Sequence, residues 1–206
     1  MRLPIFSTLI VAIACAVMIG LGLWQLDRRG EKEALLAVYR ANLGRPAIAF
    51  PATAPVADDS LFRQSSALCL EVIGWQTEIG RSVNGATGYR WIAQCRTGAQ
   101  GPGLLADMGV SRDPKARPRW TGGAVAGIIT TEPSHASLFS QLGGNGPVLR
   151  PMLVARTPAP GLAASAPPSP DDVPNNHLAY AVQWFLFAGI AATIYALALR
   201  RRMRRA

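Results

Sequence analysis

Histidine and cysteine, whose side chains bind metals and serve as bases or nucleophiles, are scarce in this chain. There are 2 histidines and 3 cysteines, and none of them forms a CxxC, CxxxC or HExxH pattern. The spacing therefore disfavours copper delivery and zinc-dependent hydrolysis. No nucleophile elbow or phosphate loop is present either, so an enzymatic function lacks a candidate site. His135 follows Glu-Pro-Ser in a turn-like stretch, and we interpret it as a loop histidine.

His177 has more informative neighbours. It follows Pro-Asn-Asn at residues 174–176, where an asparagine can cap a helix that starts there. Tyr180 and Trp184 come three and seven positions later, so they share a helical face with the imidazole, as does the small Ala181. Such a face can hold a flat apolar ring, with His177 as a ligand for a metal in that ring. The alternative is that these aromatic residues only anchor the helix at a membrane interface.

A second group of residues is expected at the same depth. Trp24, Gln25 and Arg28 lie at the end of the first long apolar stretch of the chain. Tryptophan at such a position is also what an ordinary aromatic belt supplies. We nevertheless include these three side chains with His177 as candidate ligand-binding residues.

Two membrane spans are the elements that must position these side chains. Half of the chain is hydrophobic and 16% is charged, which is too apolar for an ordinary soluble domain of 206 residues. Residues 4–26 and 178–199 each contain few polar side chains and reach the roughly 20 residues that span a bilayer. The first stretch is longer than the apolar core of a signal peptide and ends without a small-residue cleavage site. We predict transmembrane helices over residues 4–26 and 177–199.

Basic residues at the chain ends predict the orientation. The formal charge is +9, but Arg2 and five arginines of the tail 200–206 supply most of the excess, leaving 15 basic against 12 acidic residues between them. The tail predicts a cytoplasmic C-terminus, and two spans then place the N-terminus on the same side. Arg28, Arg29 and Lys32 oppose this orientation. We predict a bacterial inner-membrane protein with a periplasmic central region. A nucleic-acid-binding role is excluded, because no folded stripe of positive charge is indicated.

The central region, residues 27–157, is predicted to be one β-rich domain of the α+β class. Helical spacing continues beyond the first span and should stop by Arg45, before Pro46. Short β-like runs separated by turn residues then indicate a mainly antiparallel sheet or a small barrel. The predicted strands are residues 68–75, 89–94, 103–110, 125–131 and 148–155.

Residues 158–176 are rich in proline, alanine and serine, and this composition predicts an extended or disordered linker. Shortening residues 162–169 by two or three positions is expected to be tolerated on this interpretation.

Cys69 and Cys95 fall in the predicted periplasmic domain, where a disulfide is permitted. The sequence leaves two structural possibilities for these cysteines, one disulfide bridge or two buried thiols. Both are favoured over metal binding. Cys15 lies within the first span and is interpreted as a small membrane-buried thiol.

Three segments resemble the signature regions of the Surfeit locus (Shy-type) cytochrome c oxidase assembly factors. They are Leu-Gly-Leu-Trp-Gln-Leu-Asp-Arg-Arg at 21–29, Asn-Gly-Ala-Thr-Gly-Tyr at 84–89, and Pro-Asn-Asn-His-Leu-Ala-Tyr-Ala-Val-Gln-Trp-Phe at 174–185. Their order and the two-anchor layout also match. Where relatives have an Asn-Arg-Gly-Trp-like strand end, this chain has Asp-Met-Gly-Val at 107–110 and lacks the arginine and the tryptophan.

The resemblance implies a protein that is not an enzyme and that helps haem a enter the catalytic subunit of an aa3-type oxidase. It implies transient haem a binding, with His177 as the proposed axial ligand of the haem iron and Arg28 and Arg29 near the propionates. The expected partners are that catalytic subunit, the lipid bilayer and, as a further candidate, haem a synthase. The competing hypothesis is a membrane-anchored scaffold that holds an oxidase assembly intermediate and binds no cofactor.

Overall fold

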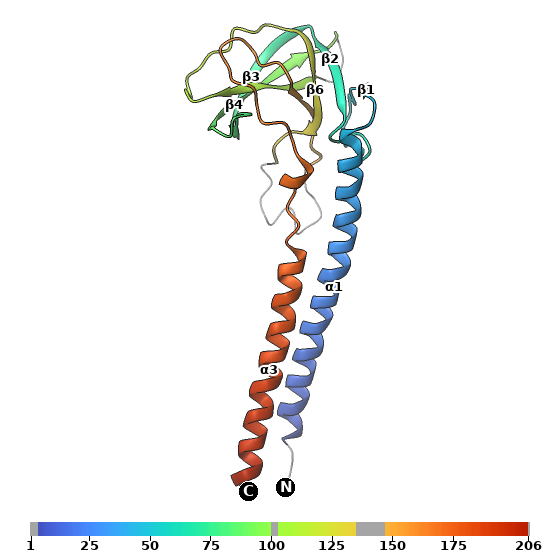
Figure 1. The fold of residues 1–206 in the computed structure, drawn as a ribbon, viewed down its shortest axis with the longest axis vertical. Coiled ribbons are helices and arrows are strands. Elements are labelled where there is room, and N and C mark those ends of the chain that lie inside the picture. The colour runs from blue at the N-terminus through green and yellow to red at the C-terminus, as the bar shows by residue number, and fades with distance from the viewer. Residues whose placement is uncertain (1–3, 100–102, 135–146, 206) are drawn as a thin grey trace. The chain divides into compact units, whose positions relative to one another are not determined.

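The computed structural model describes residues 4–99, 103–134 and 147–205. The chain divides into two compact units. The helical unit contains residues 1–35 and 173–206, and the sheet domain contains residues 36–172. Figure 1 labels both long helices and several strands of the sheet domain.

Two long helices account for the helical unit. They are α1 (Ile5–Leu43), whose last turns belong to the sheet domain, and α3 (His177–Arg205). Both are long and apolar enough to cross a membrane, as the sequence predicts. At about 1.5 Å per residue, the 39 residues of α1 exceed the roughly 30 Å hydrocarbon core. The charged half of α1 therefore continues outside the apolar stretch, and the helix ends before Pro46 as predicted.

The two helices of this unit pack antiparallel through small residues. The N-terminal part of α1 contacts the C-terminal part of α3, where the hydroxyl of Thr8 bonds to that of Tyr195 at 2.5 Å. Further along, a side chain added at Gly22 would come within 2.5 Å of the Phe185 ring. Glycine at this position therefore permits the close approach of the helices, which is a common basis of helix association in membranes.

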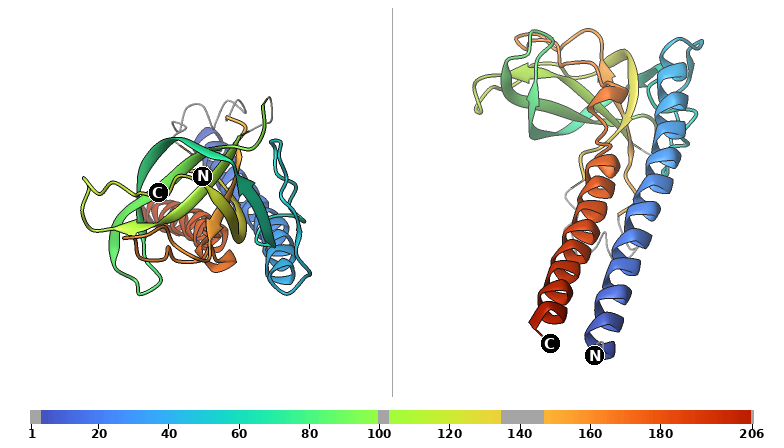
Figure 2. Two further views of the ribbon diagram at one scale, coloured as in Figure 1. Left: turned by 90° about the horizontal axis from the view of Figure 1, so that it is seen from above. Right: turned by 60° about the horizontal axis from the view of Figure 1, so that its bottom comes forward.

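A mixed seven-stranded sheet forms the second unit. The order across the sheet is β1-β2-β6-β7-β5-β4-β3, and the ladders β1–β2 and β5–β7 are parallel while the others are antiparallel. Figure 2 shows the twist of these strands. The strands are β1 (Ile48–Ala49), β2 (Gln64–Cys69), β3 (Glu71–Arg81), β4 (Thr87–Arg96), β5 (Leu104–Ser111), β6 (Gly123–Thr131) and β7 (Pro151–Ala155). The architecture confirms the membrane-anchored α+β layout.

Two predicted strands are wrong in their limits. The predicted strand 148–155 begins too early, since β7 starts only at Pro151. Residues 68–75 are not a single strand, because β2 ends at Cys69 and β3 begins at Glu71. Leu70 separates them, and its backbone N–H donates to Arg96 O at 2.9 Å instead of continuing the β2 ladder. The sequence conceals this boundary because apolar residues lie on both sides of the corner and no glycine or proline marks it.

Cys69 and Cys95 form a disulfide, so the bridge is the correct one of the two structural possibilities. Each residue is 1% exposed and belongs to the main core of the domain, with Ala93, Leu153 and Ile129. The bridge joins β2 to β4, which are not neighbours in the sheet. Closing a loop with a sequence separation of 26 residues stabilises the domain by about 3 kcal/mol in the chain-entropy model.

Residues 158–172 are not a free connector, and we call them the strap. The strap is extended, but it forms backbone hydrogen bonds with two segments of the sheet domain. Val110 and Ala163 exchange two such bonds, of 2.7 and 2.9 Å, and Val83 N donates to Ala164 O at 2.9 Å. Within the strap, Ser165 and Pro170 are buried. Of the two predicted alternatives, extended or disordered, the extended one is present, but its hydrogen bonds remove the basis for expecting tolerance to shortening.

Candidate functional site

A hydrogen bond joins His177 to Gln25 across the two helices of the helical unit. The distance from His177 Nδ1 to Gln25 Oε1 is 2.7 Å, and both residues are partly buried. An amide oxygen only accepts hydrogen bonds, so Nδ1 must carry the proton and donate it. In the neutral imidazole, the other ring nitrogen, Nε2, then carries the lone pair. This is the tautomer that a histidine needs in order to bind a metal through Nε2.

The prediction of a common depth for His177 and Gln25 thus holds within this unit, but the predicted asparagine cap does not. His177 is the first residue of α3, and Tyr180 N donates to Asn176 O at 3.2 Å. Neither Asn175 nor Asn176 caps the helix through its side chain in the described structure. The Oδ1 atom of Asn175 is buried without a hydrogen-bond partner there. The orientation of His177 therefore depends on Gln25 and not on a cap.

The face that the sequence pattern assigns to His177, Tyr180, Trp184 and Ala181 is divided in two. Ala181 is fully buried between the helices, and so is Ala188 two turns later. Tyr180 is 51% exposed and lies outside this contact, whereas Trp184 is partly buried and meets Phe187 edge-on at 6.1 Å. The small residues thus serve helix packing, and only the aromatic residues remain beside His177 to meet a ligand.

Trp24 and Arg28 form a second pair on α1. Trp24 is 49% exposed, and the Arg28 guanidinium lies 5.7 Å from the centre of its ring, within the range of a cation–π contact. Arg28 also pairs with Glu31 at 2.5 Å, and Arg29 pairs with Glu33 at 2.6 Å. The four charged side chains are 38–64% exposed, so these ion pairs are weak and each arginine can exchange its carboxylate for another anion.

No complete protein-built metal site accompanies His177. His135 lies outside the described residues. Among the residues that the structure describes, no three His, Cys, Asp or Glu side chains gather where they could hold a metal ion. A single imidazole donor among the described residues fits a metal that brings its other ligands with it, as iron does in a haem.

Comparison with protein families gives one match, the SURF1 family, over residues 12–189. The chain belongs to the SURF1 family. No curated protein matches it. The SURF1 family is associated with the assembly of cytochrome oxidase, and its members are assembly factors rather than enzymes. Such a role implies interaction with components of the oxidase.

The structure explains the middle SURF1 segment, residues 84–89, as a tight connection between β3 and β4. Gly85 has a φ of 79°, which an L side chain rarely adopts. At Gly88 an added Cβ would lie 2.6 Å from Ser111 O on the neighbouring strand β5. These two glycines have backbone roles in the sheet domain, and nothing in their geometry requires a ligand.

A buried polar cluster in the sheet domain was not predicted from the sequence. Asp107 is fully buried, and its Oδ1 accepts hydrogen bonds from Ser165 Oγ at 2.7 Å and from Gly109 N at 3.1 Å. Arg90 Nε lies 3.5 Å from Asp107 Oδ2. Arg90 and Ser165 line a pocket of about 610 Å³. The departure from the family pattern at residues 107–110 thus falls where the strap is attached, since Ser165 belongs to the strap.

The acidity of Asp107 gives a pH-dependent prediction. Burial raises the pKa of this carboxyl to about 6, although Arg90, Ser165 and Gly109 oppose the rise. The folded protein then keeps a proton that the unfolded chain releases near its ordinary pKa of 3.8. This contribution to stability is fully present below about pH 4 and is lost as pH rises through about 6. We expect its loss to lower the free energy of unfolding by about 2–3 kcal/mol.

Urea unfolding of the full-length protein in detergent, from pH 4 to pH 7.5, measures this effect. Other carboxyl groups contribute to the profile, so the informative quantity is the difference between the wild type and Asp107→Asn. That difference in the free energy of unfolding should decrease as pH rises from about 4 to about 6 and stay constant above pH 6. A difference that does not vary with pH would contradict the raised pKa.

Proposed function

We propose that this SURF1 family protein assists the insertion of haem a into the catalytic subunit of an aa3-type oxidase, and that His177 binds the haem iron. The observation that supports this most directly is the hydrogen bond from His177 Nδ1 to Gln25 Oε1, which leaves Nε2 free to coordinate. Haem iron takes imidazole as an axial ligand, so the donor fits the group.

The other candidate side chains fit a haem in different ways. Trp184 and Tyr180 lie on the same helix as His177 and offer aromatic surface to the macrocycle. Trp24 does the same from α1. Arg28 can leave Glu31 for a propionate, because exchange between two exposed carboxylates costs little. Haem a is cargo in this proposal: the protein holds it and releases it, and no bond of the macrocycle is made or broken.

The scaffold hypothesis differs in one measurable respect, since it requires no haem. We expect protein purified in detergent from cells that synthesise haem a to show the absorption bands of a haem a protein, with at most one haem per chain. A preparation without these bands, from cells whose oxidase contains haem a, would favour the scaffold. Protein from cells unable to make haem a is the matched control for adventitious absorption.

We further propose that both chain ends are cytoplasmic and that the sheet domain is periplasmic. Five arginines at the end of the chain support the first part. The Cys69–Cys95 disulfide supports the second, because such bridges persist in oxidising compartments. The C-terminal arginines and the disulfide together outweigh the opposing signal from the basic residues after the first apolar stretch. Those basic residues are interleaved with Glu31 and Glu33.

Alkaline phosphatase fusions test this topology, since the enzyme is active only after export. An insertion between Ala52 and Thr53, in an exposed loop of the sheet domain, should be active. A fusion after Ala206 should be inactive. Activity of the Ala206 fusion would contradict the proposed orientation, and a green fluorescent fusion at the same site should then be dark.

A further inference from the structure

An aromatic pocket lies in the sheet domain, which contains none of the candidate haem ligands. It has a volume of about 710 Å³ and is lined by Trp75, Trp91 and residues 114–118. The Trp75 ring meets the Trp91 ring edge-on at 6.3 Å, and it also meets the Trp120 ring at 6.5 Å. All three tryptophans are partly buried, and Trp75 and Trp120 also pack against the main core. The pocket walls are therefore fixed by the fold.

The loop that closes this pocket, residues 112–119, is held in one conformation. Asp113 N donates to Ser111 Oγ at 3.0 Å, and Asp113 Oδ1 accepts from Lys115 N at 2.8 Å. A further bond, from Ala116 N to Asp113 O at 3.2 Å, completes a turn. Pro114 and Pro118 restrict the backbone on either side of this turn. A surface that is already ordered loses little conformational entropy on binding.

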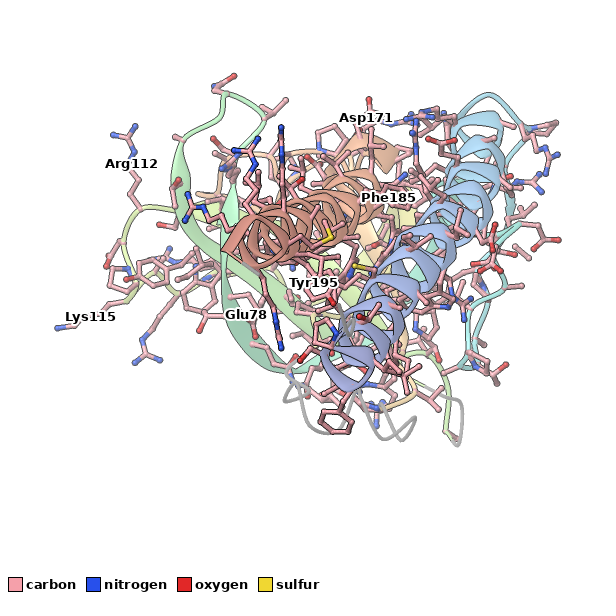
Figure 3. The ribbon with its side chains drawn as sticks, turned by 90° about the horizontal axis from the view of Figure 1, so that it is seen from below. Glu78, Arg112, Lys115, Asp171, Phe185 and Tyr195 are labelled. Carbon is pink, nitrogen blue, oxygen red and sulfur yellow. A yellow bond between two sulfur atoms is a disulfide. The ribbon has the colours of Figure 1, made fainter. Side chains whose placement is uncertain are left out.

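The same loop concentrates positive charge. Arg112, Lys115, Arg117 and Arg119 are exposed, whereas Asp113 is the one acidic residue between them. None of the four forms an ion pair with another described residue. Figure 3 shows the side chains of Arg112 and Lys115 extending away from the ribbon. Four such cations beside a tryptophan pocket are complementary to a negatively charged partner with an apolar or aromatic group.

We propose that this surface, Trp75, Trp91 and residues 112–119, binds an acidic segment of a partner protein that inserts an aromatic or large apolar side chain between the tryptophans. Carboxylates of the segment pair with the loop cations, and the inserted side chain provides the central buried contact. Tryptophan and arginine are enriched in such contacts. The inference goes beyond haem binding and does not require it.

A protein segment fits this surface better than an anionic membrane does. A loop that enters a bilayer interface exposes apolar side chains at its tip. Here the exposed tip carries Arg112 and Lys115, and the tryptophans are recessed in the pocket below. None of the exposed large hydrophobic residues of the domain, among them Leu68, Leu70 and Ile73, belongs to the loop 112–119 itself.

Photo-crosslinking in cells tests the proposal with the full-length protein. A benzoylphenylalanine in place of Lys115 should crosslink to a protein segment rich in Asp and Glu with at least one aromatic or large apolar residue, whereas the same probe at the exposed Thr87 of β4 should not. The crosslinked segment is then made as a synthetic peptide, and its affinity for purified full-length protein is measured.

Three variants give the decisive comparison. Combined Lys115→Glu, Arg117→Glu and Arg119→Glu should weaken peptide binding about tenfold or more, because three attractive pairs become repulsive. Combined Lys115→Arg, Arg117→Lys and Arg119→Lys keeps the charge and should change the affinity by less than about threefold. Trp91→Leu should weaken binding about tenfold by removing one pocket wall.

The following outcomes would overturn the proposal: crosslinks to lipid alone, no crosslink, a crosslinked segment without acidic residues, or equal affinity of the charge-reversed and charge-conserving variants. Haem a content is measured in the same preparations. Haem-free wild type that still binds the acidic peptide would contradict the proposed haem function and leave this inference standing. Wild-type protein that carries haem a but binds no acidic segment would contradict this inference and leave the proposed haem function standing.

Discussion

Replacing His177 with alanine is expected to remove haem a from the purified protein, to less than about a tenth of the wild-type content. The substitution deletes the imidazole whose Nε2 is free to coordinate iron. Membrane insertion should be unaffected, because a helix driven in by some 20 apolar residues loses little when one interfacial side chain is shortened. Absorption spectra of protein purified from equal amounts of membrane measure the effect.

Three further variants separate coordination from general packing. Gln25→Leu keeps the imidazole but removes the acceptor that fixes its tautomer, and it should weaken haem binding about 10- to 100-fold. His177→Met should retain part of the haem with a shifted spectrum, since a thioether is also a haem ligand. Trp184→Leu should have the smallest effect, through lost ring contact alone. If His177→Ala carries the wild-type amount of haem a with an unshifted spectrum, the ligand assignment is wrong.

Deleting Ala164 and Ser165 from the strap is expected to destabilise the sheet domain by about 3 kcal/mol or more. The deletion removes the acceptor of the Val83 N–H and the hydroxyl that donates to Asp107. Asp107 then stays buried with one donor fewer, at a cost of about 1–3 kcal/mol. The bond from Ala166 N to Arg81 O is also lost when the register shifts. Each broken backbone bond adds about 1 kcal/mol.

Urea unfolding of the full-length protein, followed by tryptophan emission, measures this loss. Deleting Ala52 and Thr53 is the matched control, because they come from a segment of similar composition, are exposed and form no hydrogen bond with another described residue. The control deletion should cost less than about 1 kcal/mol. Equal stability of the two deletion variants would mean that the strap contacts contribute nothing to the stability of the sheet domain. That is what the composition of the strap alone predicts.

The strap also shows where sequence-based prediction stops. Proline and alanine supply no periodic apolar face, so residues 158–172 look like a linker. The contacts that hold the strap are backbone bonds to segments more than 50 positions earlier, and composition carries no information about those partners. The Asp107 cluster escaped notice for the same reason, because the hydroxyl that donates to this carboxylate belongs to Ser165, a residue 58 positions later.

The apolar helices were predictable because length and hydropathy alone determine them. The strands β5 and β6 were predictable to within one or two residues. At the candidate haem site, the spacing of Trp24, Gln25 and His177 predicted a common depth, and the bond between Gln25 and His177 agrees with it. The sequence did not reveal that Ala181 would be used for helix packing. A small residue beside a histidine fits either an open groove or a close helix contact, and only the partner helix decides which.

The strap delays completion of the sheet domain during biosynthesis. Strand β5 lies between β4 and β7 in the sheet, and its far end pairs with the strap, so partners of this one strand span residues 87 to 165. A ribosome delivers the chain from the N-terminus, and Asp107 cannot accept the hydrogen bond from Ser165 until Ser165 has emerged. The sheet domain therefore reaches its final form only as the last residues before α3 become available. A pause in translation within α3 would therefore give the domain time to close before the second anchor is in place.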